Sequence, residues 1–515
     1  MYTFDWLVRR AELAPDRVAL VDAATGREFT YAQFNERASR FAEFLRDEWR
    51  IQPGDRIAIL AHNSSNYFEI LYGCAKIGAI LVPLNWRLAI PELEYTLNDC
   101  TPRALIYDPA FAATAEALRH PIGISLAMTL GPQPAANEWA YEQGLASASG
   151  QPLIMPPRSL DEIWFLLYTA GTTGRPKGVL QTFAMVLYNA LNIGMPIDLT
   201  SKDTTLNLLP CFHTGGLNLY ANPTFHVGGT AIIQRTFDAG ETLRLLSERA
   251  TVFFGVPAVY LFLSQHPDFE KTDLSRVRSW ACGGASMPVS LLETYARRGI
   301  LVRQGFGMTE TGPTVFLVDE AHALSKIGSV GKPQLYVEVR IADRDGHDVL
   351  PGEMGELLIK GPGVTPGYWH LPDVTAETIT AGWLHSGDVA RRDEDGYYYI
   401  VDRWKDMFIS GGENVYPAEV ENVLYAHPAI AEAAVIGVPD SKWGEVGRAV
   451  VVVKTGHMLS AQGVIDFCEG RLARYKIPKS AVFVGALPRN AAGKVLKMEL
   501  RKQFGESSNP GRGLR

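Results

Sequence analysis

Residues 168–178 read YTAGTTGRPKG and follow directly on the apolar run IWFLL at residues 163–167. A short apolar run of this kind predicts a buried β-strand. The stretch behind it combines glycines, which let backbone N–H groups approach a ligand closely, with threonine hydroxyls and two cationic side chains. A strand that opens into such a loop predicts a binding site for a polyphosphate.

This loop differs from the Walker A loop, another phosphate-binding sequence. A Walker A loop places Gly-Lys-Ser/Thr after a Gly-x-x-x-x run, whereas here Pro176 precedes Lys177. The alternative to phosphate binding is a flexible surface loop, the usual fate of segments rich in glycine and threonine. The residues of the loop alone leave that alternative open.

Length and composition predict a globular protein of more than one domain. The chain has 515 residues, of which 47% are hydrophobic and 20% charged. Its 49 basic and 56 acidic residues give a net charge of −7 and a pI near 5.9. A nucleic-acid-binding protein would usually be basic, so no nucleic-acid partner is expected.

The cysteine pattern and the hydropathy of the chain bear on its compartment. The five cysteines are odd in number and widely spaced, without a Cys-x-x-Cys pair, which argues against a disulfide framework or a zinc site and fits a reducing compartment. No signal-peptide pattern and no run of about 18 apolar residues occurs, so no transmembrane segment is expected. A cytoplasmic protein is predicted, with peripheral association with lipid left open.

The N-terminal part of the chain shows the pattern of an α/β fold. Residues 54–60 read as a turn and a buried strand, residues 67–77 as a helix ended by Gly78, and residues 79–84 as another apolar strand. Strand, helix, strand at this spacing is a βαβ unit, which implies a parallel sheet. Similar strands are expected around residues 205–209, 230–233 and 252–255.

The pattern of predicted strands and helices changes in the C-terminal third of the chain. Short strands at residues 337–342 and 355–360, with turns between them, predict a small β-rich subdomain. A domain boundary is expected at residues 401–405. Beyond it, the sequence predicts an independent α+β domain of about 110 residues, with helices near residues 417–426 and 461–472 and strands at 433–438 and 449–453.

The loop at residues 168–178 is one of an ordered series of motifs. The others are LPCFHTGG at 209–216, GFGMTET at 305–311, SGD at 386–388, DRWKD at 402–406, SGGEN at 410–414 and PRNAAGK at 488–494. Together these motifs resemble the signature of the adenylate-forming superfamily, which contains acyl-CoA synthetases, the adenylation domains of peptide synthetases and beetle luciferases. The resemblance covers most of the chain from residue 168 to residue 497.

The resemblance implies a fold and a division of the chain. The expected fold class is α/β, with a large N-terminal domain, residues 1–401, made of two α/β subdomains plus a β-subdomain. A small mobile α+β C-terminal domain, residues 402–515, is expected to rotate about Asp402. The strand and helix patterns agree with this arrangement.

The resemblance also implies a reaction in two halves. A carboxylate attacks the α-phosphorus of ATP and forms an acyl-adenylate and pyrophosphate; a thiol then attacks the acyl carbonyl and releases AMP. The implied cofactors and substrates are ATP, Mg2+, a small-molecule carboxylic acid and CoA. The leading hypothesis is therefore an ATP-dependent, AMP-forming acyl-CoA ligase.

The residues implied to hold ATP lie in the glycine-rich and hydroxyl-bearing motifs. They are Thr169, Thr172, Thr173, Gly174 and Lys177 for the β- and γ-phosphates, Gly283, Gly284 and Ala285 at the edge of adenine, Gly305, Phe306, Gly307 and Met308 along the adenine and the acyl group, Thr309 at the α-phosphate, and Asp388 and Arg403 at the ribose. Without the resemblance, Gly283-Gly284 would be interpreted as a tight turn, Asp388 as a turn residue and Lys177 as a solvated surface lysine.

Lys494, Glu310 and His213 join Thr309 as the residues implied to act in catalysis. Lys494 would contact the substrate carboxylate and the α-phosphate, where a placed charge is worth about 10²–10³ in rate. Glu310 would ligate Mg2+, for which a single carboxylate suffices because this ion keeps several waters. His213 would separate the ATP site from the acyl site; the alternative is a satisfied core histidine.

The second half-reaction implies a different orientation of the C-terminal domain. Rotation about Asp402 would withdraw Lys494 and bring another loop to the pantetheine arm. The implied CoA-binding residues are Ser410, Gly411, Gly412 and Trp443.

The acyl group is the least determined part of the hypothesis. The expected pocket residues are Phe212, His213, Leu217, Asn218, Ala281 and Gly305, together with residues 306–308. None is an obvious partner for a second carboxylate, so a medium- or long-chain fatty acid is expected. The alternative is an aryl or arylalkenoic acid of the benzoate or hydroxycinnamate type.

Two other classes of function are alternatives to an acyl-CoA ligase. A non-CoA adenylate-forming enzyme would share these motifs. An adenylate-binding sensor would be expected to lack Lys494, Glu310 or Lys177, and all three are present. A homodimer is compatible with the sequence, which carries no information on oligomeric state.

Overall fold

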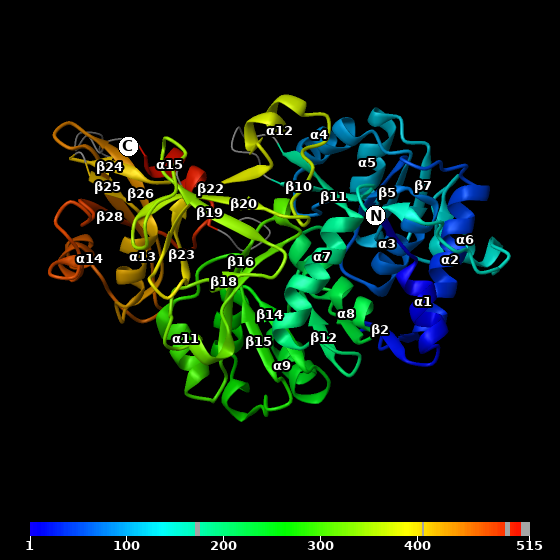
Figure 1. Cartoon of the computed structure of the whole chain (residues 1–515), viewed down its shortest axis with the longest axis horizontal. Coiled ribbons are helices and arrows are strands. Elements are labelled where there is room, and N and C mark those ends of the chain that lie inside the picture. The colour runs from blue at the N-terminus through cyan, green and yellow to red at the C-terminus, as the bar shows by residue number, and fades with distance from the viewer. Residues whose placement is uncertain (170–175, 404–405, 412, 490–494, 506–515) are drawn as a thin grey trace.

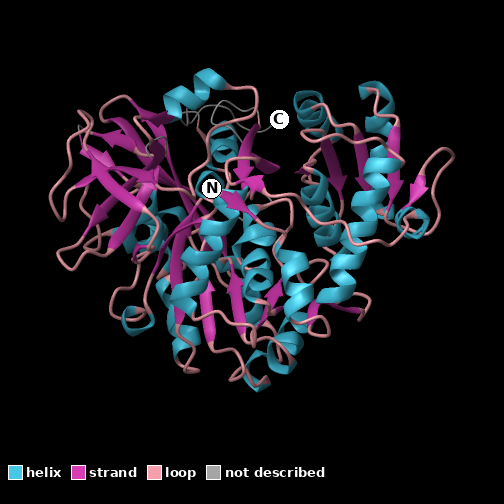
Figure 2. Cartoon of the chain, turned by 45° about the vertical axis from the view of Figure 1, so that its right-hand side comes forward, coloured by secondary structure: helices cyan, strands magenta, loops and turns pink. Residues whose placement is uncertain are grey.

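A computed structural model describes residues 1–169, 176–403, 406–411, 413–489 and 495–505 (Figure 1). The main sheets are two large α/β sheets, a five-stranded antiparallel sheet and a C-terminal sheet; strands β2 and β3, near the N-terminus, belong to the second large sheet. Helices flank the two large sheets (Figure 2). This architecture confirms the predicted fold class of two α/β subdomains, a β-subdomain and an α+β C-terminal domain.

The first large sheet has seven strands in the order β11-β10-β5-β4-β6-β7-β8. Its strands are β4 (Arg56–Leu60), β5 (Ile80–Pro83), β6 (Ala104–Tyr107), β7 (Leu126–Thr129), β8 (Trp139–Ala140), β10 (Ile163–Thr169) and β11 (Lys177–Thr182). The predicted βαβ unit is confirmed: β4 and β5 are parallel neighbours joined by α3 (Ser65–Ile77). Gly78 ends α3 with a left-handed φ of 78°, a conformation that glycine adopts without strain.

The second large sheet has nine strands in the order β18-β17-β16-β15-β14-β12-β13-β2-β3. Its parallel core consists of β2 (Val18–Asp22), β12 (Thr204–Asn207), β13 (Thr230–Ile233), β14 (Val252–Gly255), β15 (Ser279–Cys282) and β16 (Val302–Gly307), and its antiparallel edges of β3 (Glu28–Thr30), β17 (Thr314–Leu317) and β18 (Lys332–Pro333). The strands expected around residues 205–209, 230–233 and 252–255 are confirmed within this core.

Fifteen α-helices complete the described parts of the chain. Those packed with the two large sheets are α1 (Trp6–Leu13), α2 (Tyr31–Asp47), α3, α4 (Ile90–Cys100), α5 (Ala112–Ile122), α6 (Tyr141–Ser147), α7 (Phe183–Gly194), α8 (Ala221–Val227), α9 (Ala239–Glu248), α10 (Pro257–Gln265) and α11 (Val289–Ala296). Within the described residues, no helix is both long enough and apolar enough to cross a membrane.

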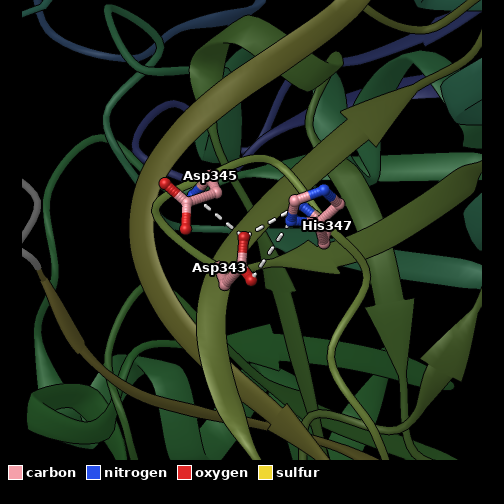
Figure 3. A group of neighbouring side chains, drawn as sticks. All are labelled: Asp343, Asp345 and His347. Atoms are coloured by element: carbon pink, nitrogen blue, oxygen red, sulfur yellow. Dashed lines mark hydrogen bonds and ion pairs between the residues drawn. The ribbon is translucent and has the colours of Figure 1, made fainter.

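The β-subdomain is a twisted antiparallel sheet of β19 (Glu338–Ala342), β20 (Met354–Lys360), β21 (Ile379–Thr380), β22 (Trp383–Arg392) and β23 (Tyr398–Arg403). The short helix α12 (Pro372–Thr378) lies beside it. A turn after β19 gathers Asp343, Asp345 and His347 (Figure 3). One carboxylate oxygen of Asp343 accepts hydrogen bonds from the backbone N–H groups of Asp345 and His347, both at 2.9 Å, so this exposed cluster closes the turn.

The C-terminal sheet contains β24 (Phe408–Ser410), β25 (Glu413–Val415), β26 (Ile430–Asp440), β27 (Gly444–Val453) and β28 (Ser480–Phe483). Its helices are α13 (Pro417–Tyr425), α14 (Ala461–Cys468) and α15 (Lys497–Phe504). The helix expected over residues 461–472 is four residues shorter, because Glu469 takes an extended conformation (φ −64°, ψ 136°) and Gly470 follows with a left-handed φ of 72°.

The proposed hinge residue lies where the two parts of the chain meet. Asp402 is in the last strand of the β-subdomain, opposite Val389. Its Oδ2 accepts a hydrogen bond of 2.9 Å from the backbone N–H of Ala418, in the first turn of α13. The hinge assignment stays a prediction, and this contact ties its carboxylate to the first helix of the C-terminal domain.

A buried ion pair stabilises the N-terminal subdomain. Lys76, 2% exposed, places its Nζ 2.6 Å from Asp5 Oδ2 and donates to Asn35 and to the carbonyl of Leu153. Asp5 also accepts from the N–H groups of Val8 and Met155. The pair therefore joins α1, α2, α3 and the segment before β10.

Lys76→Met is expected to lower the free energy of unfolding by about 3–5 kcal/mol, because it leaves the Asp5 carboxylate buried without its cation. Urea unfolding followed by circular dichroism measures this loss. The double variant Asp5→Asn/Lys76→Met removes both charges and should lose clearly less. A single-variant loss under about 1 kcal/mol, the range of surface ion pairs, would contradict the interpretation.

Candidate active site

A cavity of about 450 Å³ opens at the carboxyl ends of the parallel strands in the nine-stranded sheet. Its walls include the residues that directly follow β12, β13, β14, β15 and β16. This edge of an α/β sheet is where ligands usually bind, because the loops after the strands converge there. Trp86 and Arg87 from the first large sheet and Arg489 from the C-terminal domain also line it.

Nine of the residues predicted for the site line this cavity. They are His213, Ala281, Gly283, Gly284, Gly305, Phe306, Gly307, Met308 and Thr309. Gly307 packs so closely that a Cβ there would lie 1.9 Å from the carbonyl oxygen of Pro313. The glycines of the GFG motif therefore let the backbone of β17 approach β16 as well as leaving space in the cavity.

Phe212, Leu217 and Asn218 do not line the cavity, which corrects the expected acyl pocket. The chain makes a single π-helical turn over Gly215–Leu219, and this turn carries Leu217 and Asn218 into the core, where both are fully buried. Asn218 hydrogen-bonds to Gly312, Asn222 and Asn189. Its amide therefore holds the turn in place rather than facing a substrate.

Several lining residues were not among those predicted for the site. They are Trp86, Arg87, Ile193, Thr214, Leu219, Arg235, Phe254, Phe316 and Leu317. Thr214 could have been predicted from the sequence, since it directly follows His213 in the LPCFHTGG motif. Phe254 and Arg235 share only their position at the end of a parallel strand, and Ile193 lies in a helix without any motif.

His213 is a neutral imidazole at the wall of the cavity. Burial, and secondarily the nearby Arg87 guanidinium, lower the pKa of His213 to about 4. Its buried Nε2 has no hydrogen-bond partner among the described residues. A carboxylate substrate is already ionised at neutral pH, so this site does not need His213 as a base.

The predicted phosphate loop begins and ends on described strands. Thr169 ends β10 and lies opposite Lys177, the first residue of β11. Thr172, Thr173 and Gly174 lie outside the described residues. The ammonium of Lys177 lies 5.2 Å from the centre of the Tyr368 ring.

Glu310 occupies a short 3₁₀ turn, Thr309–Thr311, directly after β16. Its carboxylate is buried, and burial raises the pKa of Glu310 above its ordinary value. The Tyr368 hydroxyl donates a 3.1 Å hydrogen bond to Glu310 Oε1. Oxygen ligands suit Mg2+, which needs few protein carboxylates, so a buried carboxylate beside the phosphate loop fits that ion.

Asp388 and Arg403, the predicted ribose contacts, face each other across β22 and β23. Arg403 Nε lies 3.2 Å from Asp388 Oδ1. Asp388 is buried, so its carboxylate is held by this ion pair. Ala285 follows the cavity-lining Gly283 and Gly284 and is exposed.

The predicted CoA-binding residues gather on one side of the C-terminal sheet. Ser410 lies opposite Gly444, and the N–H of Gly411 donates to the carbonyl of Trp443 at 2.8 Å. Gly411 has a φ of 62°, and a Cβ there would lie 2.8 Å from the Trp443 ring. Gly412 lies outside the described residues. The described members of this group do not line the cavity.

The C-terminal domain presents a different segment to the cavity. Arg489 lines it and pairs with Val495 through an antiparallel bridge. Lys494, the residue predicted to act in adenylation, lies outside the described residues. The domain therefore has the Arg489–Val495 bridge at the cavity and the Gly411–Trp443 contact away from it.

Comparison with known sequences identifies the family. The profile of the AMP-binding enzyme family matches residues 7–369, and that of the AMP-binding enzyme C-terminal domain matches residues 419–494. The chain belongs to this family of adenylate-forming enzymes. It is an ATP-dependent, AMP-forming acyl-CoA ligase that uses ATP, Mg2+ and CoA.

Individual relatives cover nearly the whole chain. A feruloyl-CoA synthase from Amycolatopsis sp is 43% identical over 501 residues, which are 97% of this chain and 98% of the relative. The long-chain-fatty-acid–CoA ligase FadD13 of Mycobacterium tuberculosis is 38% identical over 513 residues, 98% of this chain and 99% of the relative. The o-succinylbenzoate-CoA synthetase of Bacillus subtilis in complex with its acyl-adenylate superposes with a TM-score of 0.87 at 32% identity, covering 97% of this chain and 98% of that one.

The lowered pKa of His213 gives this ligase a predicted pH dependence of stability. An unfolded imidazole titrates near 6.5, whereas the folded one titrates near 4. Between these values the unfolded chain takes up a proton that the folded chain does not, so stability falls as the pH falls. His213→Gln should therefore show a smaller drop in melting temperature between pH 7 and pH 5 than the wild type.

The control for this measurement is His347→Gln, which changes an exposed histidine in the turn of the β-subdomain. It should keep the wild-type drop. Equal drops for His213→Gln and the wild type would show that this histidine is solvated in the folded protein.

Proposed function

We propose that this ligase activates an aromatic monocarboxylic acid of the arylalkenoate type and transfers it to CoA. The observation that carries the proposal is the composition of the acyl end of the cavity. Ile193, Leu219, Ala281 and Leu317, with Phe254 packed against them, belong to one apolar cluster and also line the cavity. An apolar, closely packed wall favours a flat hydrophobic group.

A second carboxylate on the substrate would be poorly accommodated at that end. Arg278 and Arg303 are the basic residues near the cluster, and both are engaged with protein groups. Arg278 pairs with Asp203 at 2.7 Å, and Arg303 donates to the carbonyls of Val318 and Pro196. A buried carboxylate without its own cation costs several kcal/mol, which supports a monocarboxylic acid.

Two buried hydroxyls of the protein favour a substituted aromatic acid over a plain alkyl acid. Thr214 lines the cavity and its Oγ1 is buried, and Tyr220, whose Oη is also buried, lies in the cluster beside Phe254. Among the described residues neither oxygen has a hydrogen-bond partner. A buried hydroxyl without a partner costs about 1–3 kcal/mol, and a phenolic or methoxy substituent on a ring would supply the partner that a methylene chain lacks.

The sequence identities of the relatives are consistent with an aromatic acid as the substrate. The feruloyl-CoA synthase is more similar to this chain than the fatty-acid ligase is. The expected medium- or long-chain fatty acid is not confirmed and stands as the second candidate, favoured by the apolar lining. Pyrophosphate release with ferulate, cinnamate, benzoate and palmitate, each with and without CoA, tests the choice.

Thr214→Val should reduce kcat/KM for ferulate about 5- to 30-fold, because it removes a hydrogen bond of about 1–2 kcal/mol to the ring substituent. The same variant should leave kcat/KM for cinnamate within about 3-fold, since that acid has no substituent to bond. The measurement is the ratio of the two specificity constants.

Thr314→Val is the matched control. Thr314 also lines the cavity, but its hydroxyl is already bonded to Asn189 at 2.8 Å, so its loss should leave the ferulate-to-cinnamate ratio unchanged. A Thr214→Val variant with the wild-type ratio, or a wild type that prefers palmitate, would argue for the alkyl acid.

The roles proposed for the remaining residues follow the two half-reactions. In adenylation, Lys177 and Thr169 hold the phosphates, Thr309 contacts the α-phosphate and Asp388 orients the ribose. Mg2+ held by Glu310 would neutralise phosphate charge as pyrophosphate leaves. His213 remains neutral between the acyl and nucleotide ends, and Ser410, Gly411 and Trp443 receive the pantetheine arm after rotation at Asp402.

Lys494→Ala should reduce adenylate formation by about 10²-fold or more, because it removes the charge placed where negative charge develops. Transfer from preformed acyl-adenylate to CoA should stay within about 3-fold of the wild type, since the proposed rotation withdraws this residue. Rapid-quench measurements separate the two steps. Equal losses in both steps would remove the assignment of Lys494 to adenylation.

A further inference from the structure

Three segments far apart in the chain meet beside Glu310. They are the start of β11, the 3₁₀ turn Thr309–Thr311 and residues 365–369. Thr365 donates its backbone N–H to the carbonyl of Glu310 at 2.8 Å. The buried Gln181 of β11 donates its side-chain amide to the carbonyl of Thr309, also at 2.8 Å. The turn that carries the proposed magnesium ligand is therefore held from two sides.

Residues 365–369 run alongside β11 as an added edge. Val179 and Tyr368 form an antiparallel bridge. On either side of it, Leu180 donates to the carbonyl of Gly367 at 3.1 Å and Trp369 donates to the carbonyl of Gly178 at 2.7 Å. These backbone bonds fix the position of Tyr368 independently of its side chain.

The side chain of Tyr368 contacts both charged groups of the proposed metal and phosphate site. Its hydroxyl donates to Glu310 Oε1 at 3.1 Å, and its ring lies 5.2 Å from the ammonium of Lys177. Among the described residues, Tyr368 is the side chain that hydrogen-bonds to this carboxylate. The bond limits rotation of the carboxylate and leaves Oε2 for a cation.

We propose that Tyr368 is a positioning residue for MgATP: its hydroxyl orients the Glu310 carboxylate toward magnesium, and its ring holds the Lys177 ammonium at the phosphate loop. The inference rests on the proposed roles of Glu310 and Lys177. A hydrogen bond to a charged group is directional and stronger than a neutral one, and a cation over an aromatic face is attracted by the ring quadrupole. One side chain thus sets the spacing between two groups that must act on the same polyphosphate.

A purely structural role for the hydroxyl predicts different behaviour. The segment is anchored by its backbone bonds to β11 and by Trp369, whose ring N–H donates to the carbonyl of Asp99 at 3.3 Å. Removing one oxygen from Tyr368 leaves all of these contacts in place. Tyr368→Phe therefore tests orientation of Glu310 while keeping the ring, the segment and the contact with Lys177.

The experiment measures ATP binding by the whole protein as a function of magnesium, with the ligand-induced rise in melting temperature as the readout. Tyr368→Phe should raise the magnesium concentration for half-maximal effect about 10- to 150-fold, the range expected when a hydrogen bond to a charged group is lost. Binding of ATP in the presence of a chelator should stay at the wild-type value.

Tyr399→Phe is the matched control, because Tyr399 makes the same kind of bond, to Asp393 Oδ2 at 3.2 Å, on the far strand of the β-subdomain. It should leave the magnesium dependence unchanged. Wild-type magnesium dependence in Tyr368→Phe, or an equal shift in both variants, would overturn the inference.

Glu310→Gln separates this inference from the role of Glu310 itself. If Glu310→Gln abolishes the magnesium effect and Tyr368→Phe causes no further change in that background, the two residues act as one unit, as proposed. A magnesium dependence that survives Glu310→Gln would overturn the metal assignment and the Tyr368 inference together. Loss in Glu310→Gln with a wild-type Tyr368→Phe would overturn the Tyr368 inference alone.

Discussion

The corner around Glu310 is the constraint on which the site depends. A carboxylate buried at the end of a parallel strand is costly unless other groups hold it. Here the Tyr368 hydroxyl donates to the carboxylate, and the N–H of Thr365 donates to the backbone carbonyl of the same residue. Those groups belong to the segment that runs alongside β11, which starts at Lys177. Burial of one charge therefore couples the seven-stranded sheet, the nine-stranded sheet and the entry to the β-subdomain. In this arrangement Lys177 and Glu310, the proposed ligands of phosphate and magnesium, both contact Tyr368.

The same arrangement separates the proposed nucleotide end of the cavity, which is polar, from the proposed acyl end, which is apolar. The loops after β15 and β16 supply glycines and Thr309 to the cavity, whereas α7 and the ends of β14 and β17 supply the apolar wall. His213 lines the cavity as a neutral group, since burial lowers its pKa to about 4. A neutral side chain there adds no charge that would compete with Lys177 or Lys494 for the acid. Arg489 of the C-terminal domain lines the cavity, whereas Gly411 and Trp443, the proposed CoA contacts, do not.

Most of the fold was accessible from the sequence for physical reasons, and the charged residues of the proposed site were predicted from its motifs. Buried parallel strands read as apolar runs, and Gly78 marks a helix end because of its left-handed φ. Phosphate chemistry demands glycine, hydroxyl and cation in one loop, so residues 168–178 were informative. The residues of the acyl pocket were harder to predict from the sequence, because residues next to His213 in the chain need not face the cavity as it does. The π-helical turn at Gly215–Leu219 carries Leu217 and Asn218 into the core. Tyr368 could not be found from sequence at all, since its contacts with Glu310 and Lys177 exist only once residues 365–369 lie against β11.

The most direct test of the account is a crystal structure of the protein with a non-hydrolysable feruloyl-adenylate analogue. The account predicts the aromatic ring among Ile193, Phe254 and Leu317, with its phenolic substituent within hydrogen-bonding distance of Thr214 Oγ1 and the phosphate beside Thr309. A ring bound instead near Trp86 and Arg87, with the apolar end of the cavity unused, would contradict the assignment of that end to an aromatic acid.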